Sequence, residues 1–246
     1  MDSTFGLCEL FMRTQELACF NDALGVFRLL CVCVLVVLFA DLGFAQTRGP
    51  APQDDTQVWP EVQITVPLNK RVDLTVNSQL RVGRRVTDFV DERGGMGLAI
   101  KAGKYLTLAP SYLHIATQPT PDRKAFENRL SFAATVRLPA FKSFTVTDRN
   151  QLERRFRTPT NSTRYRNRLQ VERAVKIGGA DFRLFVADEV FYDLSVDSWT
   201  RNRFAVGVGR SLNKFFSTDV YYMRQNDGHS RPGDIHIIGS VLRVRL

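Results

Sequence analysis

Arginine and glutamate recur at every second position in two neighbouring stretches of the sequence. Residues 144–157 carry Arg149, Glu153 and Arg155, and residues 165–176 carry Arg166 and Glu172. Side chains that alternate in this way share one face of a β-strand, where guanidinium and carboxylate groups form charge-assisted hydrogen bonds. The charged groups on such a face either pair with one another in an ion-pair network or attract anions. The predicted network consists of Arg129, Arg149, Glu153, Arg155, Arg166, Arg168, Glu172, Glu189 and Arg203.

Histidine offers the alternative chemistry, a lipid-modifying hydrolase embedded in a membrane. The sequence has three histidines, His114, His229 and His236. A hydrolase of this kind pairs a serine with a histidine that a third polar group orients. Ser111 lies three residues from His114 and therefore on the opposite face of its strand. We expect neither a catalytic residue nor a cofactor or metal, and the lipid hydrolase remains the alternative function.

The first 45 residues have the features of a secretory leader. Arg28 precedes an apolar run of twelve residues, 29–40, which is shorter than the roughly 20 that a membrane-spanning helix needs. The small-residue site Gly43-Phe44-Ala45 predicts cleavage after Ala45, and Met12 is an alternative start that gives a leader of ordinary length. The uncleaved alternative is a membrane anchor. All four cysteines fall within these 45 residues, which argues against a disulfide framework or a thiolate metal site in the mature chain.

Cleavage also changes the charge. The whole chain has 34 Lys+Arg and 25 Asp+Glu, of which two and five lie in the leader, so the mature chain has a net charge of +12. Charge of this sign is compatible with nucleic acid, anionic lipid or anionic solutes. The arginines alternate along strands instead of clustering with stacking aromatics, so we expect no nucleic-acid binding.

The mature chain reads as a flexible segment, residues 46–58, followed by a β-barrel from 59 to 246. Alternating polar and apolar residues predict strands longer than the usual five or six of globular proteins, close to the 9–11 that a tilted membrane strand needs. The expected connections alternate between short turns and longer loops, which is typical of a membrane barrel with the short turns in the periplasm. The eleven expected strands are Val62–Leu68, Val72–Val82, Gly94–Lys101, Tyr105–Thr117, Phe126–Leu138, Phe144–Arg157, Tyr165–Lys176, Asp181–Tyr192, Trp199–Leu212, Phe215–Gln225 and Ile235–Leu246.

The expected fold is therefore all-β, an antiparallel up-and-down transmembrane barrel. Bacterial single-chain barrels have an even number of strands with both termini in the periplasm, so we predict 10–12 strands and favour twelve. A charge on the lipid face costs roughly 2–4 kcal/mol at the membrane midplane, which directs the charged rows into the lumen. Aromatics near strand ends predict interfacial girdles, with Trp59, Tyr105, Phe141, Phe144, Phe156, Tyr165, Tyr192, Trp199, Phe215 and Phe216 as members.

Several short motifs resemble those of a known family. They include Trp59 with Leu68-Asn69-Lys70-Arg71, Glu127-Asn128-Arg129-Leu130, the run 149–155 (RNQLERR), Tyr165-Arg166-Asn167-Arg168 and Tyr221-Tyr222. Between about residues 59 and 246 the chain resembles the bacterial domain-of-unknown-function family 2490 (DUF2490), whose members are predicted outer-membrane barrels. The resemblance implies the barrel fold and supplies no catalytic residues. Barrels of this kind usually end in an aromatic residue, whereas this chain ends in Leu246.

These features lead to one expectation and several open questions. We expect a Gram-negative outer-membrane barrel with a lumen lined by arginine and glutamate, acting as a small pore or as a structural envelope protein. Its partners would be outer-membrane lipid, the barrel-assembly machinery and, if the lumen is open, small anionic solutes. A lumen filled by salt bridges and an arginine-lined passage remain open alternatives, as does a soluble β-protein of the periplasm.

Overall fold

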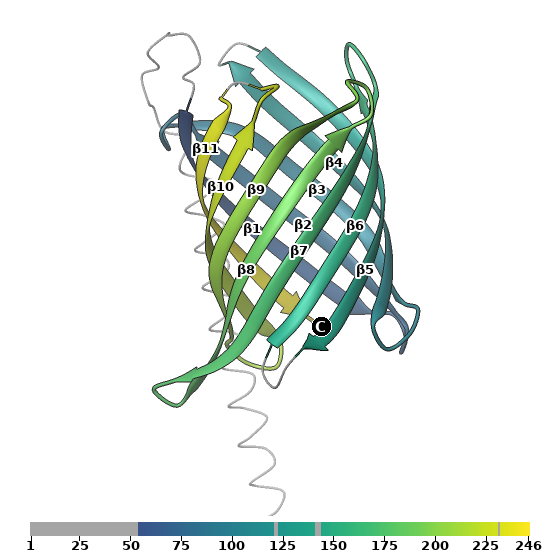
Figure 1. Ribbon diagram of the computed structural model, residues 1–246, viewed down its shortest axis with the longest axis vertical. Coiled ribbons are helices and arrows are strands. Elements are labelled where there is room, and N and C mark those ends of the chain that lie inside the picture. Colours follow the sequence, from purple (N-terminus) through teal and green to yellow (C-terminus); the bar gives the residue numbers. More distant parts are fainter. Residues whose placement is uncertain (1–53, 121–122, 141–143, 231) are drawn as a thin grey trace, which may run out of the picture. The chain divides into compact units, whose positions relative to one another are not determined.

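Eleven strands form a single closed barrel (Figure 1). The computed structural model describes residues 54–246 apart from 121–122, 141–143 and 231. The described residues contain no helix long and apolar enough to cross a membrane. The strands are β1 (Asp54–Pro67), β2 (Val72–Gly83), β3 (Asp88–Lys101), β4 (Leu106–Thr120), β5 (Arg123–Ala140), β6 (Phe144–Arg157), β7 (Ser162–Ile177), β8 (Ala180–Asp193), β9 (Ser198–Ser211), β10 (Phe216–Asp227) and β11 (Asp234–Arg245).

The barrel closes through a parallel pair of strands. Each strand from β1 to β11 pairs antiparallel with the next along the chain, and β1 then pairs parallel with β11, from Asp54 opposite Asp234 to Thr65 opposite Arg245. The all-antiparallel arrangement and the favoured count of twelve strands are therefore wrong. An odd number of up-and-down strands leaves the first and last running in the same direction, so only a parallel ladder can join them.

The two ends of the barrel are named here by their orientation in Figure 1. β1 begins at the upper end, and β11 finishes at the lower end, where the C-terminus is marked. The predicted contrast between short turns and long loops is largely absent, because the strands extend into the expected loops. At the upper end residues 84–87 join β2 to β3, and at the lower end residues 68–71 join β1 to β2.

The alternating pattern located all eleven strands and underestimated the length of several. β6 has the bounds expected from the sequence, Phe144–Arg157. β1 begins at Asp54 instead of Val62, so residues 54–58 of the expected flexible segment are strand. They extend the ladder to β11, and Asp55 and Gln57 are buried on the lumen side. Residues 46–53, the expected leader 1–45 with its cleavage site, and Met12 lie outside the described residues.

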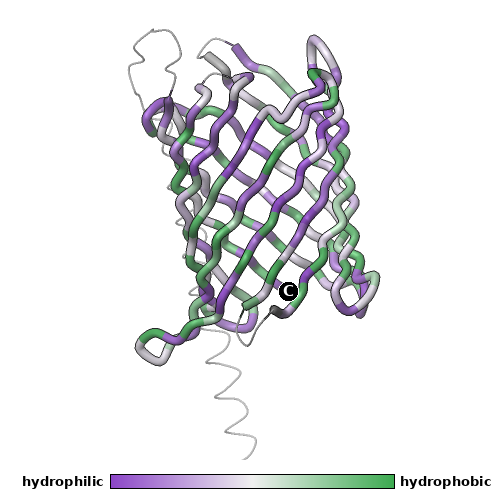
Figure 2. The backbone as a smooth tube through the Cα atoms, viewed as in Figure 1, coloured by the Kyte–Doolittle hydropathy of each residue, from purple (hydrophilic) through white to green (hydrophobic). Residues whose placement is uncertain are grey.

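The barrel wall has a polar inner face and a mostly apolar outer face. Figure 2 shows hydrophilic and hydrophobic residues alternating along the strands. Buried charged groups such as Glu153 and Arg203 belong to the inner face, whereas large apolar side chains on the outer face are exposed. Examples from strands around the barrel are Val62, Val76, Met96, Leu130, Phe132, Leu152, Leu169, Leu184, Phe204, Val220 and Ile238.

Candidate functional site: the charged lumen

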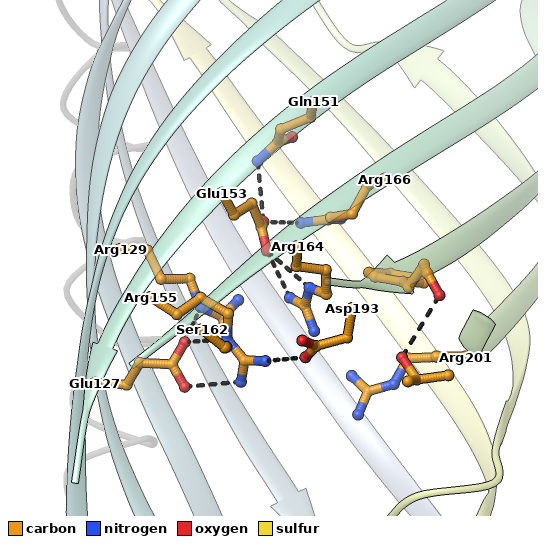
Figure 3. Close-up of polar contacts among 12 residues, drawn as sticks. Glu127, Arg129, Gln151, Glu153, Arg155, Ser162, Arg164, Arg166, Asp193 and Arg201 are labelled. Carbon is orange, nitrogen blue, oxygen red and sulfur yellow. Dashed lines mark hydrogen bonds and ion pairs between the residues drawn. The ribbon is translucent and has the colours of Figure 1, made fainter. Parts of the chain in front are cut away.

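Glu153 is the centre of an ion-pair network in the upper half of the lumen (Figure 3). One of its carboxylate oxygens accepts hydrogen bonds from Arg164 Nε at 3.0 Å and Nη2 at 2.6 Å. The other accepts from Arg166 Nη1 at 2.6 Å and from Gln151 Nε2 at 3.0 Å. The Glu153 side chain is almost completely buried. β6 and β7 bring these groups together because Glu153 and Arg164 are register partners that both point inward.

A second carboxylate, Glu127 of β5, holds two arginines. Arg155 donates from Nε to Glu127 Oε1 at 2.8 Å and from Nη2 to Oε2 at 3.0 Å, the two-pronged geometry that suits a planar guanidinium. Arg129 also donates to Glu127. The same Arg155 reaches Asp193 of β8, with Nη1 3.5 Å from Oδ2. These bonds link β5, β6 and β8 along the inner face of the wall, and Figure 3 draws the contacts among Glu127, Arg155 and Asp193.

Glu189 of β8 extends the network towards the middle of the barrel. It accepts from Arg166 Nη2 at 2.7 Å and from Arg149 Nη2 at 3.1 Å, and Arg203 Nη1 lies 3.7 Å from it. Arg203 also donates to Gln225 of β10 at 2.8 Å. We call Glu127, Arg129, Glu153, Arg155, Arg164, Arg166, Glu189, Asp193 and Arg203 the upper network.

Two buried aromatic side chains stand inside this network. The Phe191 ring is completely buried, and the guanidinium carbons of four arginines lie 4.7–5.7 Å from its centroid. Those residues are Arg164, Arg166, Arg201 and Arg203. Arg81 lies over the Trp59 ring at 3.3 Å. Rings in these positions give cations a favourable contact away from water.

The position of Trp59 corrects the expected aromatic girdle. It faces the lumen, where its Nε1 donates to Gln57 at 2.7 Å, and does not lie at an outer rim. It packs with a cluster of buried apolar residues from β9, β10 and β11: Ala205, Met223, Ile235 and Ile237. This cluster lies on the inner face of the parallel pair β1–β11 and of the neighbouring strands β9 and β10, in the upper half of the lumen. Phe141, another expected girdle member, lies outside the described residues.

The lower half of the lumen carries ion pairs of a different kind. Arg183 joins Glu172 at 2.9 Å to Asp219 at 2.6 Å, and Asp219 also accepts from Arg243 at 2.6 Å. Arg137 is a further partner of Glu172. The same end holds Asp73, with Lys101 and Arg245 each 3.3 Å away. We call Asp73, Lys101, Arg137, Glu172, Arg183, Asp219, Arg243 and Arg245 the lower ring.

Exposure separates the lower ring from the upper network. The basic side chains of the lower ring are 35–60 % exposed. In the upper network Arg129, Arg155 and Arg164 are at most 10 % exposed. Water therefore reaches the basic side chains of the lower ring and is largely excluded from the upper network, whereas the lower-ring carboxylates Asp73, Glu172 and Asp219 are buried.

A cavity of about 440 Å³ lies between these two layers. It extends from upper-network groups such as Arg129 to lower-ring groups such as Arg243. Two inward-facing glycines allow aromatic rings that line the cavity to lie close to the barrel wall. Phe185 and Tyr221 lie flat over Gly207 and Gly239, where an added Cβ would come within 2.4 Å and 2.1 Å of their rings.

The structure places all nine predicted network residues on the inner face. Seven belong to the upper network or contact it directly, with Arg149 attached through Glu189. Glu172 lies in the lower ring. Arg168 stands apart, donating to Gln170 at 2.9 Å, which in turn donates to Glu172 at 3.2 Å.

Sequence reasoning missed Trp59 and Phe191 as lumen residues. Trp59 alternates with Gln57 and Glu61, and Phe191 with Glu189, so the alternation did mark both as inward-facing. Trp59 precedes the expected strand Val62–Leu68, and Phe191 lies near the end of β8, which hid that signal. Other charged lumen groups absent from the predicted set include Arg81, Asp91, Glu127, Arg164, Arg183, Asp193, Arg201, Asp219 and Arg243.

Two of the histidines lie on the outer face of the barrel. His114 Nδ1 is 2.8 Å from Asn128 Oδ1, and His236 Nδ1 is 2.7 Å from the Tyr222 hydroxyl. Ser111 lines the cavity on the other side of the wall from His114. Among the described residues no serine or threonine hydroxyl is recorded in hydrogen-bond contact with either imidazole, and the hydrolase alternative remains a prediction.

Polar groups on the outer face of β6 and β7 pair with one another. Asp148 accepts from Asn150 at 2.9 Å and from Asn167 at 2.7 Å. These residues sit between exposed apolar neighbours such as Leu152 and Leu169. Their mutual hydrogen bonds lower the cost of placing amide and carboxylate groups on an otherwise apolar wall.

Comparison with known proteins identifies the family. The model of the family described as "Protein of unknown function (DUF2490)" matches residues 56–235, most of the described barrel. The chain belongs to the DUF2490 family. Among curated proteins no match to this sequence is found. Membership in DUF2490 agrees with the resemblance drawn from the sequence motifs and assigns no activity to the lumen.

Proposed function

We propose that this DUF2490 protein is an outer-membrane β-barrel that is closed at its upper end and serves as a non-conducting envelope protein. Support for the membrane location comes from the outer wall, where side chains such as Phe132, Leu152 and Phe204 are about half exposed. Soluble proteins rarely expose large contiguous apolar surfaces, and strands of 12–18 residues are long enough to cross a bilayer while tilted. Outer-membrane lipid and the barrel-assembly machinery are the partners this proposal implies.

One observation supports the closed state above all others. The upper network and the two buried rings pack together in the upper half of the lumen, with Glu153, Phe191 and Trp59 at most 2 % exposed. An open pore needs a continuous water-filled path, and the burial of these groups argues against such a path through the upper half of the barrel. Opening a path would separate Glu153 from two arginines, and breaking a buried pair costs about 3–5 kcal/mol.

The proposal is tested by locating the full-length protein and measuring its conductance. Cells expressing the whole sequence are fractionated, outer membranes are washed at alkaline pH, and the detergent-purified protein is inserted into planar bilayers. We expect retention in the washed membrane and no steady current. Release by the alkaline wash would overturn the membrane location, and discrete steady current steps would overturn the closed state.

A matched pair of double variants sharpens the conductance test. Glu153→Ala with Arg164→Ala removes an inward register pair, and Leu152→Ala with Tyr165→Ala removes the adjacent outward pair of the same strands. We expect anion-preferring current from the first, because the remaining lumen is rich in arginine, and silence from the second. Equal silence in both would show that the upper network does not close the lumen.

A further inference from the structure

The lining of the lumen cavity carries a large excess of positive charge. Eleven arginines contribute to it, against four carboxylates, Glu61, Glu153, Glu189 and Asp219. Five of the arginines pair with carboxylates outside the lining: Arg81 and Arg93 with Asp91, Arg129 with Glu127, Arg183 with Glu172 and Arg201 with Asp227. Counting those four acids as well as the four in the lining still leaves three of the eleven positive charges uncompensated. The basic residues are Arg81, Arg93, Arg129, Arg149, Arg164, Arg166, Arg168, Arg183, Arg201, Arg203 and Arg243.

Two of these arginines face each other directly. Arg149 of β6 and Arg168 of β7 are register partners, and both point into the cavity. Like charges directly opposite on neighbouring strands destabilise a sheet. Glu189 lies opposite Arg168 in the next ladder, but its carboxylate is hydrogen-bonded to Arg149 and Arg166.

Both side chains have hydrogen-bonding capacity to spare. The Arg149 Nε is buried and has no hydrogen-bond partner among the described residues. A third of the Arg149 side chain is nevertheless exposed, although the residue lies halfway along its strand, so it borders the cavity space. Arg168 donates to the neutral Gln170, and no ion pair is recorded for it with a described carboxylate.

We propose that Arg149 and Arg168 form a binding site for a small water-soluble anion that carries a phosphate or carboxylate group. Paired guanidinium groups match the oxygens of either group, and an anion between them would relieve their repulsion. The 440 Å³ cavity lies within the 300–1,000 Å³ of ordinary ligand sites. Gln151, Gln170 and Tyr221 also line it and supply neutral hydrogen-bonding groups for the rest of the ligand.

The site deepens the proposed function, because a lumen closed above makes the cavity a dead-end site that a solute enters past the lower ring. The exposed lower-ring arginines Arg137, Arg183 and Arg243 would draw anions towards that entrance. The membrane location and the closed state are tested by fractionation and conductance, whereas the site is tested by binding, so either can fail without the other.

The test is calorimetric titration of the purified full-length protein with glycerol 3-phosphate at low ionic strength, with sodium chloride as the reference salt. Arg149→Gln and Arg168→Gln are expected to weaken binding about tenfold each, the size expected for losing one charged hydrogen bond. Arg154→Gln and Arg173→Gln are the matched controls, because these arginines lie on β6 and β7 with their side chains largely exposed on the outer face. Unchanged affinity in both lumen variants, or no binding by the parent protein, would overturn the site.

Two further measurements distinguish a soluble-anion site from a lipid site and from a purely structural arginine pair. Lysophosphatidic acid is glycerol 3-phosphate with one acyl chain attached. If the protein binds this lipid but does not bind glycerol 3-phosphate, the assignment to a soluble anion is overturned. The melting temperature without ligand distinguishes a binding site from a structural pair. Arg168→Gln should leave it unchanged or raise it by removing the repulsion from Arg149, and a lower melting temperature with unchanged affinity would contradict the proposal.

Discussion

The upper and lower halves of the lumen use the same residue types under different conditions of hydration. Glu153 in the upper half and Glu172 in the lower half each accept hydrogen bonds from two arginines. The arginines of Glu153 are 5 % and 15 % exposed, whereas those of Glu172 are 35 % and 60 % exposed. Water screens the second set and is largely excluded from the first, so equivalent pairs contribute unequally.

This difference assigns a separate role to each half. Buried pairs are weak evidence of a net gain in stability, but removing one partner leaves an uncompensated charge. The upper network is therefore maintained because separating any of its ion pairs would leave a buried charge without a partner. An exposed arginine such as Arg245, which pairs with the buried Asp73, can exchange that partner for water or ions, which suits an entrance.

The largest effect is expected from the same substitution made in each half. Glu153→Ala leaves Arg164 and Arg166 without that carboxylate and should lower the free energy of unfolding by about 3–5 kcal/mol. Glu172→Ala should lower it by less, about 1 kcal/mol, because the Glu172 carboxylate is buried but the arginines left behind are 35 % and 60 % exposed and water solvates them. Denaturant unfolding in detergent, followed by tryptophan fluorescence, measures both. Equal losses of unfolding free energy in the two variants would contradict the proposed difference in hydration between the upper and lower halves of the lumen.

Aromatic rings offer a second comparison, with a smaller effect. Phe191→Leu keeps an apolar side chain and removes the ring that four guanidinium groups face, which should cost about 2 kcal/mol. Phe185→Leu is the control, since one arginine lies 5.7 Å from that ring. The same unfolding measurement applies, and a greater loss from Phe185→Leu would contradict the role given to Phe191.

A single methyl group added to the barrel wall should reduce the volume of the cavity by displacing an aromatic ring. Gly239→Ala would place its Cβ against the Tyr221 ring and displace that ring into the cavity. We expect a loss of about 1–2 kcal/mol from overpacking and weaker binding of glycerol 3-phosphate. Gly103→Ala, at a lower-end turn where an added Cβ meets nothing within 4 Å, serves as the control. Unchanged affinity in Gly239→Ala would show that Tyr221 does not border the ligand.

The smallest effect is expected at the lower rim. Arg245→Ala removes one of two basic partners of Asp73, and Lys101 remains 3.3 Å from that carboxylate. The unfolding free energy should fall by about 0.5 kcal/mol or less, and 1 M salt should abolish the difference. A loss above about 2 kcal/mol would show that the lower rim is as well shielded as the upper network.

The sequence predicted the strands and the inward or outward direction of many side chains. It did not predict which inward residues lie at the same height along the barrel axis. Alternation located every strand and assigned Arg149, Glu153 and Glu189 to the inner face, because side-chain direction depends only on parity along a strand. Which inward residues share a level depends on the stagger between strands, and each register in turn depends on pairing partners far away in the sequence. The division into a dry upper half and a hydrated lower half could not be derived from parity.

The parallel pairing of β1 with β11 also could not be predicted from the sequence, because it too depends on partners far apart in the chain. β1 and β11 are the most distant strands in the chain, and nothing in the local pattern around Val62 or Ile235 specifies that they meet. Knowledge of even-stranded barrels favoured twelve strands. Trp59 shows the opposite case, in which parity indicated the lumen correctly while proximity to the strand end suggested a girdle.

The parallel closure also constrains how the barrel is assembled. Asp54 pairs with Asp234, so the seam joins segments separated by nearly the whole described chain and cannot form until β11 has been made. Such long-range contacts bear a high loop-closure entropy and form late in folding. Until then both β1 and β11 present unpaired edges, which are prone to pairing with other chains. Loss of β11 would therefore leave an open sheet with two exposed edges, and it would remove Ile235 and Ile237 from the apolar cluster behind the seam.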